Sequence, residues 1–472
     1  MSNPDRFIPP EVDAELTPKT RAFVHLLFDR IDELTKRVEK LEAMLAKLTP
    51  QNSSIPPSTV HPHAKPLSKK PQSSRKRGGQ PGHKRHQRTL IPTDLCDTVE
   101  RFMPTVCRCC NQPLHGNDSD PLRHQVSELP PTRPIVTEYQ LGRLQCPRCK
   151  ITTCAELPNG VPTGAYGPRL IAFAGLLMGH FRQSKRKTSQ FISDLLNIPC
   201  CSSMTVKMQN IVSQSLAAPH EDLRQALAYE RNVHMDETPT KQADSKAWLW
   251  VATTKKYAVF TVFSSRAATA ITHLLGEDFQ GIVNCDRAKM YFLLKHLQWC
   301  WSHLIRDFQA MIDSEVPDRI ALGTKLSEQA QRMFRNWHGY KAKELSWEQF
   351  QASTLPIAKK VNQLLYLGGG SHDRKLRNQC LSLHAHHENL WRFMCNEGIE
   401  PTNNTAERAL RGPVIYRKLS FGTQSETGSR YVERIFSVIE TCRLQNRSVF
   451  EYLFEAVSAR LSKQKAPSLL TP

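Results

Sequence analysis

The most regular pattern of apolar positions lies near the start of the chain. Apolar residues follow one another there at alternating steps of three and four, namely Val24, Leu27, Ile31, Leu34, Val38, Leu41, Leu45 and Leu48. This spacing is a heptad seam with leucine at every d position and mostly β-branched residues at a, which favours a parallel two-stranded coiled coil. We expect residues 1–49 to form a dimerisation helix. A single amphipathic helix packed on its own chain is the alternative.

The apolar pattern stops over residues 50–95, where proline, serine, lysine and arginine dominate. No acid occurs between Glu42 and Asp94. Such a segment buries too little apolar surface to offset the entropy of ordering it, so we expect a flexible basic linker. Its charge suits contact with DNA phosphates, and a plain solvated linker is the alternative. The candidate DNA contacts are Lys69, Lys70, Arg75, Lys76, Arg77, Lys84 and Arg85.

Two Cys-x-x-Cys pairs mark residues 96–157. Their arrangement matches the plan of a zinc ribbon, in which two tight turns converge on one tetrahedral ion. Four thiolates leave no open coordination position, so we expect structural zinc. Incidental thiols are the alternative, because Cys109 and Cys154 lie nearby. The predicted ligands are Cys107, Cys110, Cys146 and Cys149.

Helical periodicity dominates residues 158–228. Within it, segments 187–196 and 202–212 flank a break at Ile198-Pro199. This pattern is consistent with a helix-turn-helix that binds DNA, and equally with two ordinary packed helices.

Strand periodicity begins at Arg231. A short strand ends at Asp236, a hairpin spans residues 247–262, a helix follows, and a buried strand over 281–285 ends at Asp286. Three strands in a meander, a helix and a fourth strand are the opening of a ribonuclease H-like sheet. The first and fourth strands of that sheet lie side by side and parallel, so we expect the two aspartates at one edge.

A third acid is predicted on a helix laid across this sheet. Thr402-Asn403-Asn404 can cap a helix that carries Glu407 in its early turns. Phosphodiester chemistry with two divalent ions needs carboxylates that converge on the metals. Single acids at strand ends are usually structural, but three acids on these elements favour catalysis by Asp236, Asp286 and Glu407. His303 is more typical of a packing residue.

Cations follow the third acid along its predicted helix. They are candidates to position DNA phosphates, and solvated helix charges are the equal alternative. These residues are Arg408, Arg411, Arg417 and Lys418.

Composition agrees with a polyanionic partner. Lysine and arginine number 64 against 44 acids, a formal net charge of +20, and contact with DNA phosphates releases their counterions. A length of 472 residues indicates several domains. No segment has the pattern of a signal peptide or membrane span. The 14 cysteines are scattered, so we expect reduced thiols and a cytoplasmic, nucleoid-associated protein.

The local sequence around each of the three acids resembles the corresponding motifs of the DDE transposases of insertion-sequence family sixty-six. The likeness extends to the Gly-Gly-Gln-Pro-Gly-His box at 78–83, the cysteine pairs and Ile439-Glu440-Thr441. It departs at Arg287, where the family usually has glycine. The segments that carry the resemblance are 234–239, Asp286 with Tyr291, 300–308, 403–411 and Arg417-Lys418.

The resemblance implies a multidomain α+β protein. Its parts are the coiled coil, the zinc ribbon and a ribonuclease H-like α/β catalytic core at 229–445, with a helical insertion at about 305–399, before a C-terminal helix and tail at 446–472. The implied activity is magnesium-dependent cleavage of 3′ ends of an insertion element and their transfer to target DNA, with two Mg²⁺ ions. Accessory proteins of the same element are further implied partners. A non-catalytic DNA-binding regulator and a nuclease without strand transfer are the alternatives.

Overall fold

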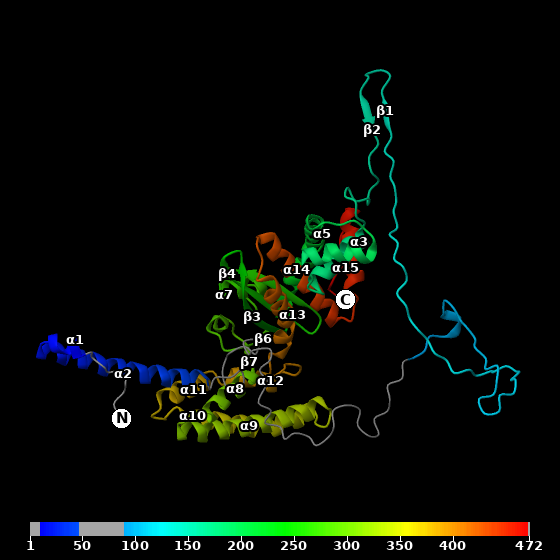
Figure 1. Ribbon diagram of the computed structural model, residues 1–472. Coiled ribbons are helices and arrows are strands. Elements are labelled where there is room, and N and C mark those ends of the chain that lie inside the picture. Colours follow the sequence, from blue (N-terminus) through cyan, green and yellow to red (C-terminus); the bar gives the residue numbers. More distant parts are fainter. Residues whose placement is uncertain (1–9, 47–88, 471–472) are drawn as a thin grey trace. The chain divides into compact units, whose positions relative to one another are not determined.

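The computed structural model describes residues 10–46 and 89–470 (Figure 1). The chain divides into one unit of residues 61–135 and another of residues 1–60 and 136–472. In the described parts, no helix combines the length and apolar character needed to cross a membrane. Outside the described residues lie the predicted DNA contacts of the basic linker, Lys69, Lys70, Arg75, Lys76, Arg77, Lys84 and Arg85.

The N-terminal segment forms helices α1 (Pro10–Glu15) and α2 (Pro18–Ala46). The predicted long helix is therefore confirmed as α2. Its heptad side chains Leu27, Ile31, Leu34 and Val38 are 46–55% exposed. An apolar stripe this exposed has its packing surface free, and its pairing with a second copy stays a prediction.

Residues 89–165 contain little regular structure. Their elements are η2 (Thr93–Leu95), β1 (Arg143–Gln145) and β2 (Thr152–Cys154), and the two strands pair antiparallel. Every residue of β1 and β2 is exposed.

Helices dominate the following segment. They are α3 (Pro168–Gly179), α4 (Lys185–Leu196), α5 (Ser202–Ser215), α6 (Ala217–Ala226) and η3 (Leu227–Tyr229). Helices α4 and α5 form where the helix-turn-helix pattern places them, and Asn197 ends α4 with a left-handed φ of 54°. A Cβ on Gly175 of α3 would lie 2.9 Å from Val212 of α5, so these helices pack closely. DNA contact by α4 and α5 stays a prediction.

A five-stranded mixed sheet forms the next layer. Its strands are β3 (Asn232–Gln242), β4 (Ser245–Thr253), β5 (Ala258–Phe263), β6 (Ile282–Cys285) and β7 (Leu297–Trp299). The spatial order is β5-β4-β3-β6-β7, with β3 to β5 antiparallel and β6 and β7 parallel to β3. The predicted parallel pairing of the first and fourth strands is confirmed. Between β5 and β7 lie α7 (Ala268–Leu275) and η4 (Lys289–Leu293).

Strand β3 is longer than predicted. The sequence suggested an end at Asp236, but β3 continues through Pro239 to Gln242 beside β4. The carbonyl of Pro239 accepts a hydrogen bond from Arg417, so the backbone of this residue faces away from β4. Strand β6 has already ended on that side, and a proline without an N–H is tolerated at such an open edge.

The edge of the sheet formed by β5 is covered by α14 (Glu426–Leu444). Three side chains one helical turn apart on α14 accept the outward N–H groups of alternate β5 residues. The spacings agree because four helical residues rise about 6 Å and two strand residues about 6.8 Å. The pairs are Val262 with Glu433 at 2.7 Å, Phe260 with Ser437 at 2.8 Å and Ala258 with Thr441 at 3.1 Å.

A run of helices follows β7, where the sequence suggested a helical insertion. It contains α8 (Trp301–Ile312), α9 (Pro317–Lys341), α10 (Trp347–Gly368), α11 (Arg374–Ala385) and α12 (Glu388–Cys395). Trp337, Phe350 and Phe393 form its aromatic core, with ring centroids 5.6–6.1 Å apart. The side-chain amide of Gln298 in β7 donates to the carbonyl of Leu390 at 3.2 Å and accepts the N–H of Phe393 at 2.8 Å, which ties the insertion to the end of the sheet.

Two further helices complete the described chain. Helix α13 (Asn404–Ser420) packs against β3 and β4, as Figure 1 shows. Helix α15 (Val449–Leu461) packs against α3 and α5. The predicted helix across the sheet is therefore α13.

Candidate active site

Asp236 and Asp286 meet where β3 and β6 run in parallel. The register pairs His234 with Asn284. Continued by two residues, it places Asp236 opposite Asp286, and the two-residue period of a strand puts both on one face. Asp286 lies just beyond β6, and its carboxylate accepts the N–H of Ala288 at 2.8 Å. The sequence prediction of adjacent strand-end aspartates therefore holds for Asp286, whereas Asp236 lies within its strand.

Buried amides fix the start of α13 against the sheet. The side chain of Asn403 donates to the carbonyl of Met235 at 2.6 Å and lies 3.2 Å from the His234 ring nitrogen Nδ1. The side chain of Asn284 donates to the carbonyl of Glu400 at 2.6 Å. Asn403 occupies the N-cap position, but its side chain makes no capping hydrogen bond. It binds β3 beyond the end of β6 instead, which replaces the predicted capping role.

Glu407 lies in the first turn of α13. Its Oε1 is 3.7 Å from the Arg306 guanidinium and 3.9 Å from His303 Nδ1. Burial raises the pKa of Glu407, the charges of Arg306 and Arg411 oppose that shift, and the charge of Asp286 adds to it. Burial lowers the pKa of His303 to about 4, so this imidazole is neutral near pH 7.

The predicted acids form one electrostatic cluster. Burial raises the pKa of Asp236 well above its usual range, and the charges of Glu237, Asp286 and Glu407 raise it further. Carboxylates that oppose one another's ionisation in this way are a favourable setting for a divalent cation. Among the described residues, however, the group whose ligand atoms all lie within 4.8 Å of one another is Cys300, His303 and Glu407.

Three residues behind the aspartates were not predicted to act at the site. The carboxylate of Glu237 is almost fully buried and accepts the Tyr291 hydroxyl at 2.7 Å and Arg266 Nε at 2.7 Å. Arg266 also lies 3.8 Å from Asp286. Strand alternation points Glu237 to the face opposite Asp236. Glu237 could have been identified from the sequence as a residue near the site, because it directly follows Asp236.

Arg287, which departs from the family pattern, is turned toward α8. Its guanidinium forms an ion pair with Asp307, and both side chains are about a quarter exposed. The arginine is thereby held by a partner other than the predicted catalytic acids.

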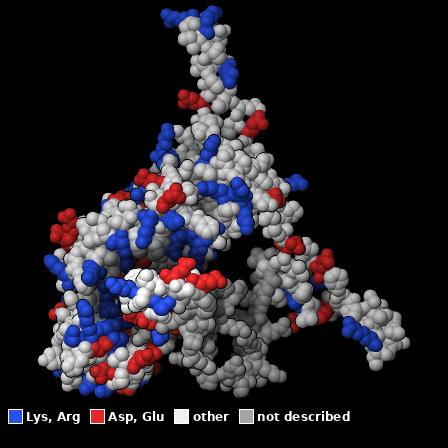
Figure 2. Space-filling model, turned by 60° about the vertical axis from the view of Figure 1, so that its left-hand side comes forward, with Lys and Arg blue, Asp and Glu red and all other residues white. Residues whose placement is uncertain are grey.

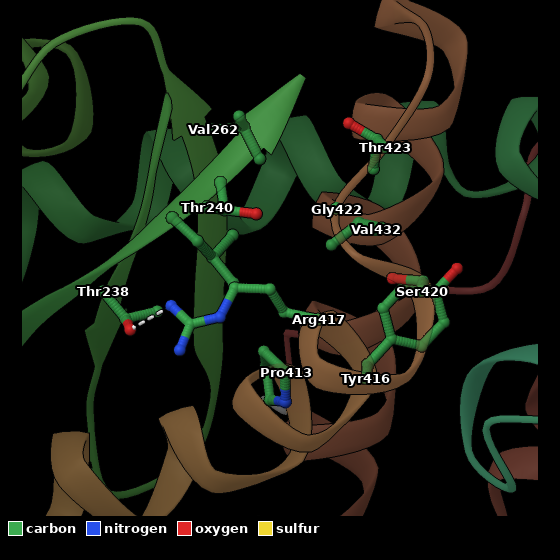
Figure 3. A pocket seen from close by; sticks show the side chains of 11 residues that line it. Thr238, Thr240, Val262, Pro413, Tyr416, Arg417, Ser420, Gly422, Thr423 and Val432 are labelled. Atoms are coloured by element: carbon green, nitrogen blue, oxygen red, sulfur yellow. Dashed lines mark hydrogen bonds between the residues drawn. The ribbon is translucent and has the colours of Figure 1, made fainter. Parts of the chain in front are cut away.

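The predicted phosphate contacts on α13 have different surroundings. Arg417 donates to the Thr238 hydroxyl at 2.9 Å and to the Pro239 carbonyl, and it lines a small pocket between β3 and α13 (Figure 3). This guanidinium is engaged with the protein, and burial lowers its pKa. Arg408 and Arg411 are exposed, as is Lys418. Figure 2 shows lysine and arginine spread over much of one face, interspersed with acids.

The two cysteine pairs adopt the same turn. The N–H of Asn111 donates to the Cys107 carbonyl at 3.0 Å, and that of Lys150 donates to the Cys146 carbonyl at 2.9 Å. Asn111 and Lys150 both have positive φ, 56° and 62°.

Backbone N–H groups also act on the first sulfur of each pair. The N–H of Cys110 lowers the pKa of Cys107, and that of Cys149 lowers the pKa of Cys146. Each turn thus favours a thiolate. The first pair belongs to the unit of residues 61–135, and the second belongs to the larger unit.

Comparison with known proteins gives three matches. Residues 164–431 match the Transposase IS66 family, and residues 4–89 match a family of unknown function (DUF6444). "Uncharacterized protein y4qI" of Sinorhizobium fredii (strain NBRC 101917 / NGR234) is 25% identical over 258 residues. That alignment spans 48% of this chain and 47% of the relative, about half the length of each. Because the first match covers more than half of the chain and includes Asp236, Asp286 and Glu407, the protein belongs to the IS66 transposase family.

Proposed function

We propose that this protein is a DNA transposase of the DDE type, with Asp236, Asp286 and Glu407 as its catalytic carboxylates. The observation that carries the proposal is their common charge cluster, built from β3, the end of β6 and α13 in a chain of a transposase family. The strand order β5-β4-β3-β6-β7 supports a ribonuclease H-like core.

The donor set fits magnesium. Carboxylate oxygens are the ligands that Mg²⁺ prefers, and the mutual repulsion that raises the pKa of Asp236 would be relieved by a cation. Asp236, Asp286 and Glu407 would hold the metal. When bound, two such ions lower the pKa of an attacking oxygen and stabilise the leaving oxygen.

The residues of the chain prepare this site for in-line attack at phosphorus. Asn403 and Asn284 fix the start of α13, and with it Glu407, against the aspartates. Glu237 holds Arg266 beside Asp286. Arg411, whose charge acts on Glu407, is placed to bind a phosphate of the incoming strand.

Two displacements follow one another in this site. Water attacks the phosphorus at the element end, the bond to the 3′ oxygen breaks, and that oxygen leaves as a hydroxyl. The freed hydroxyl then attacks a phosphorus of the target DNA. The bond from that phosphorus to the 3′ oxygen of the target strand breaks, and this oxygen leaves. Neither step requires a covalent bond between enzyme and DNA.

The remaining modules serve DNA capture and assembly in this proposal. The basic linker tracks phosphates, and α2 pairs with a second copy. Structural zinc on the two Cys-x-x-Cys pairs stays part of the proposal, and what supports it within each turn is a thiol whose pKa is lowered by backbone N–H groups. Element ends, target DNA and accessory proteins of the element are the proposed partners.

The substitution Glu407→Gln tests the proposal. It removes one carboxylate charge while keeping the side-chain shape, so magnesium-dependent cleavage of element-end DNA is expected to fall by at least about a hundredfold. DNA binding, measured by fluorescence anisotropy, is expected to change little. Glu455→Gln, on the exposed side of α15, is the matched control.

Each alternative function has its own outcome in the same assay. Undiminished cleavage by Glu407→Gln would overturn the assignment of this acid. Cleavage by the wild-type protein without strand transfer would identify a nuclease. Binding without cleavage in the presence of Mg²⁺ would identify a DNA-binding regulator.

A further inference from the structure

Three side chains of different chemistry converge where β7, α8 and α13 meet. Cys300 follows β7 as the N-cap residue of α8, and His303 lies in the first turn of that helix. Glu407 comes from the first turn of α13. One sulfur, one imidazole nitrogen and one carboxylate oxygen lie within 4.8 Å of one another.

Two of these atoms are shielded from solvent and lack a hydrogen-bond partner. They are Nδ1 of His303 and Oε1 of Glu407. Buried polar atoms in folded proteins are nearly always satisfied, so a facing pair of orphans calls for a missing binding partner. Both atoms belong to the same three-residue group, so the two unsatisfied polar atoms lie at one place in the structure.

The distance between the two orphan atoms discriminates among possible partners. They are 3.9 Å apart, which is too long for a direct hydrogen bond. A zinc ion lies about 2.0–2.2 Å from nitrogen and oxygen ligands, so two ligands of one ion are at most about 4.3 Å apart. The observed separation falls inside that limit and needs only a small closure to reach tetrahedral geometry.

The neighbours of the group are compatible with a bound cation. The sulfur of Cys300 is buried and accepts the N–H of Asn403 at 3.1 Å, a bond that also stabilises a thiolate. Asp286 adds negative charge near His303. The opposing cation is Arg306, 3.7 Å from Glu407 Oε1 and not hydrogen-bonded to it. The Arg306 side chain is partly exposed, and its Nε donates to the carbonyl of Ser302 at 3.3 Å rather than to Glu407.

We propose that Cys300, His303 and Glu407 form a binding site for a borderline-soft divalent ion of the Zn²⁺ class, separate from the proposed magnesium position. Thiolate and imidazole ligands select Zn²⁺ or Co²⁺ and are poor ligands for Mg²⁺. Three protein ligands leave a fourth coordination position for water or a phosphate oxygen.

Sharing of Glu407 gives the site a regulatory consequence, which rests on the proposed function. An ion bound to Cys300 and His303 holds Oε1 of Glu407 on the α8 side and withdraws this carboxylate from Asp236 and Asp286. Zinc at this position therefore inhibits magnesium-dependent cleavage by competition for one ligand.

Cobalt binding to the full chain tests the site without any activity measurement. Co²⁺ bound to thiolate absorbs in the near ultraviolet, and equilibrium dialysis gives the number of ions per chain. Loss of a residue that is only hydrogen-bonded to a metal ligand lowers the affinity for the metal by about 10–100-fold. Loss of a ligand itself, in Cys300→Ser or His303→Ala, is therefore expected to lower the affinity at least as much. We expect each variant to bind one cobalt ion fewer per chain than the wild type.

Cys442→Ser is the matched control, because Cys442 is an equally buried thiol outside the group. The two Cys-x-x-Cys pairs are unchanged in every variant, so any cobalt bound there adds the same number of ions to each protein. Thermal unfolding and near-ultraviolet circular dichroism verify that each variant is folded. Equal cobalt stoichiometry in wild type, Cys300→Ser and Cys442→Ser would overturn the site.

Zinc inhibition tests the regulatory consequence separately. In the presence of saturating Mg²⁺, the zinc concentration that halves cleavage is expected to rise at least about tenfold in Cys300→Ser. Equal inhibition of both proteins would refute competition for Glu407. A wild-type protein that binds cobalt through Cys300 but never cleaves DNA would contradict the proposed function and leave the metal site standing.

Discussion

Asp236 is held in a setting that opposes its own ionisation. Its pKa is raised by burial and by three neighbouring acids, so the folded protein holds this proton more tightly than the unfolded chain does. The resulting contribution to stability is fully present below the ordinary aspartate pKa of about 4. It is lost as the pH rises through the raised pKa. The metal-free site is therefore expected to lower stability at neutral pH.

The substitution Asp236→Asn is expected to stabilise the metal-free protein at pH 7. The amide keeps an oxygen for the N–H of Glu237 and removes the repelling charge. A gain on the order of 1 kcal/mol, or about 2–4 °C in Tm, is reasonable for a domain of this size. Thermal unfolding with a chelator from pH 4 to pH 8 measures it, and the advantage over wild type is expected to shrink toward pH 4.

The exposed Asp278 supplies the control for that experiment. Asp278→Asn removes a carboxylate outside the cluster and is expected to leave Tm and its pH dependence unchanged. A lower Tm for Asp236→Asn at pH 7 would mean that this carboxylate stabilises the fold.

At the scale of single elements, the border between β5 and α14 shows how a strand edge is closed by side chains. The outward N–H groups of β5 bind Glu433, Ser437 and Thr441. All three acceptors are buried or nearly so, hence each removal leaves a donor without a partner. Such closure also keeps the edge from pairing with another chain.

Ser437→Ala is expected to lower the free energy of unfolding by about 1–3 kcal/mol, because the N–H of Phe260 loses its acceptor. Denaturant unfolding of the full chain measures the change. Ser458→Ala is a matched control, since the hydroxyl of Ser458 is buried without a hydrogen-bond partner. A loss of equal size in both variants would show that the edge hydrogen bond contributes nothing.

Prediction of helices and strands from the sequence succeeded where the apolar periodicity extends over many residues. It failed where tertiary contacts determine whether a strand forms or how far it extends. The hairpin of β4 and β5 and the pairing of β3 with β6 follow from apolar patterning and strand order. Strand β7 was missed because it has only three residues, too few for a period. The extension of β3 past Pro239 was missed because it depends on β6 ending early, which is a tertiary fact.

The same division applies to the candidate site. The three acids were selected from their neighbours in the sequence, and their catalytic role stays a proposal. The ion pair of Arg287 with Asp307 was not, because a guanidinium on a flexible stem can reach many partners. Asn403 was read as a helix cap from its local sequence, whereas its binding to Met235 joins residues 168 positions apart.

At the scale of the whole molecule, the exposed stripe of α2 is the feature best suited to join two copies. Its d-position residue Leu34 is 47% exposed in the single chain. A coiled coil in water derives its stability from burial of such a stripe. Assembly through α2 would bring two catalytic units to one DNA element without any contact between the sheets.

Leu34→Asp is expected to convert a dimer to a monomer, because a carboxylate in the seam must lose its water on pairing. Sedimentation velocity of the full chain at micromolar concentration measures the mass. Lys36→Asp, at the f position on the outside of the same predicted coil, is expected to remain dimeric. Equal mass for Leu34→Asp and the wild type would exclude pairing through this seam.

The covered edge of β5 has a consequence for how the protein is made. Phe260 and its acceptor Ser437 are 177 residues apart, so the strand emerges from the ribosome long before the helix that closes it. At about 5–20 residues per second, the edge stays open for roughly 9–35 seconds in each nascent chain. During that interval the growing polypeptide exposes a strand able to pair with a neighbour, and any chain terminated before residue 433 keeps that hazard permanently. Complete translation is thus a condition for the solubility of this sheet.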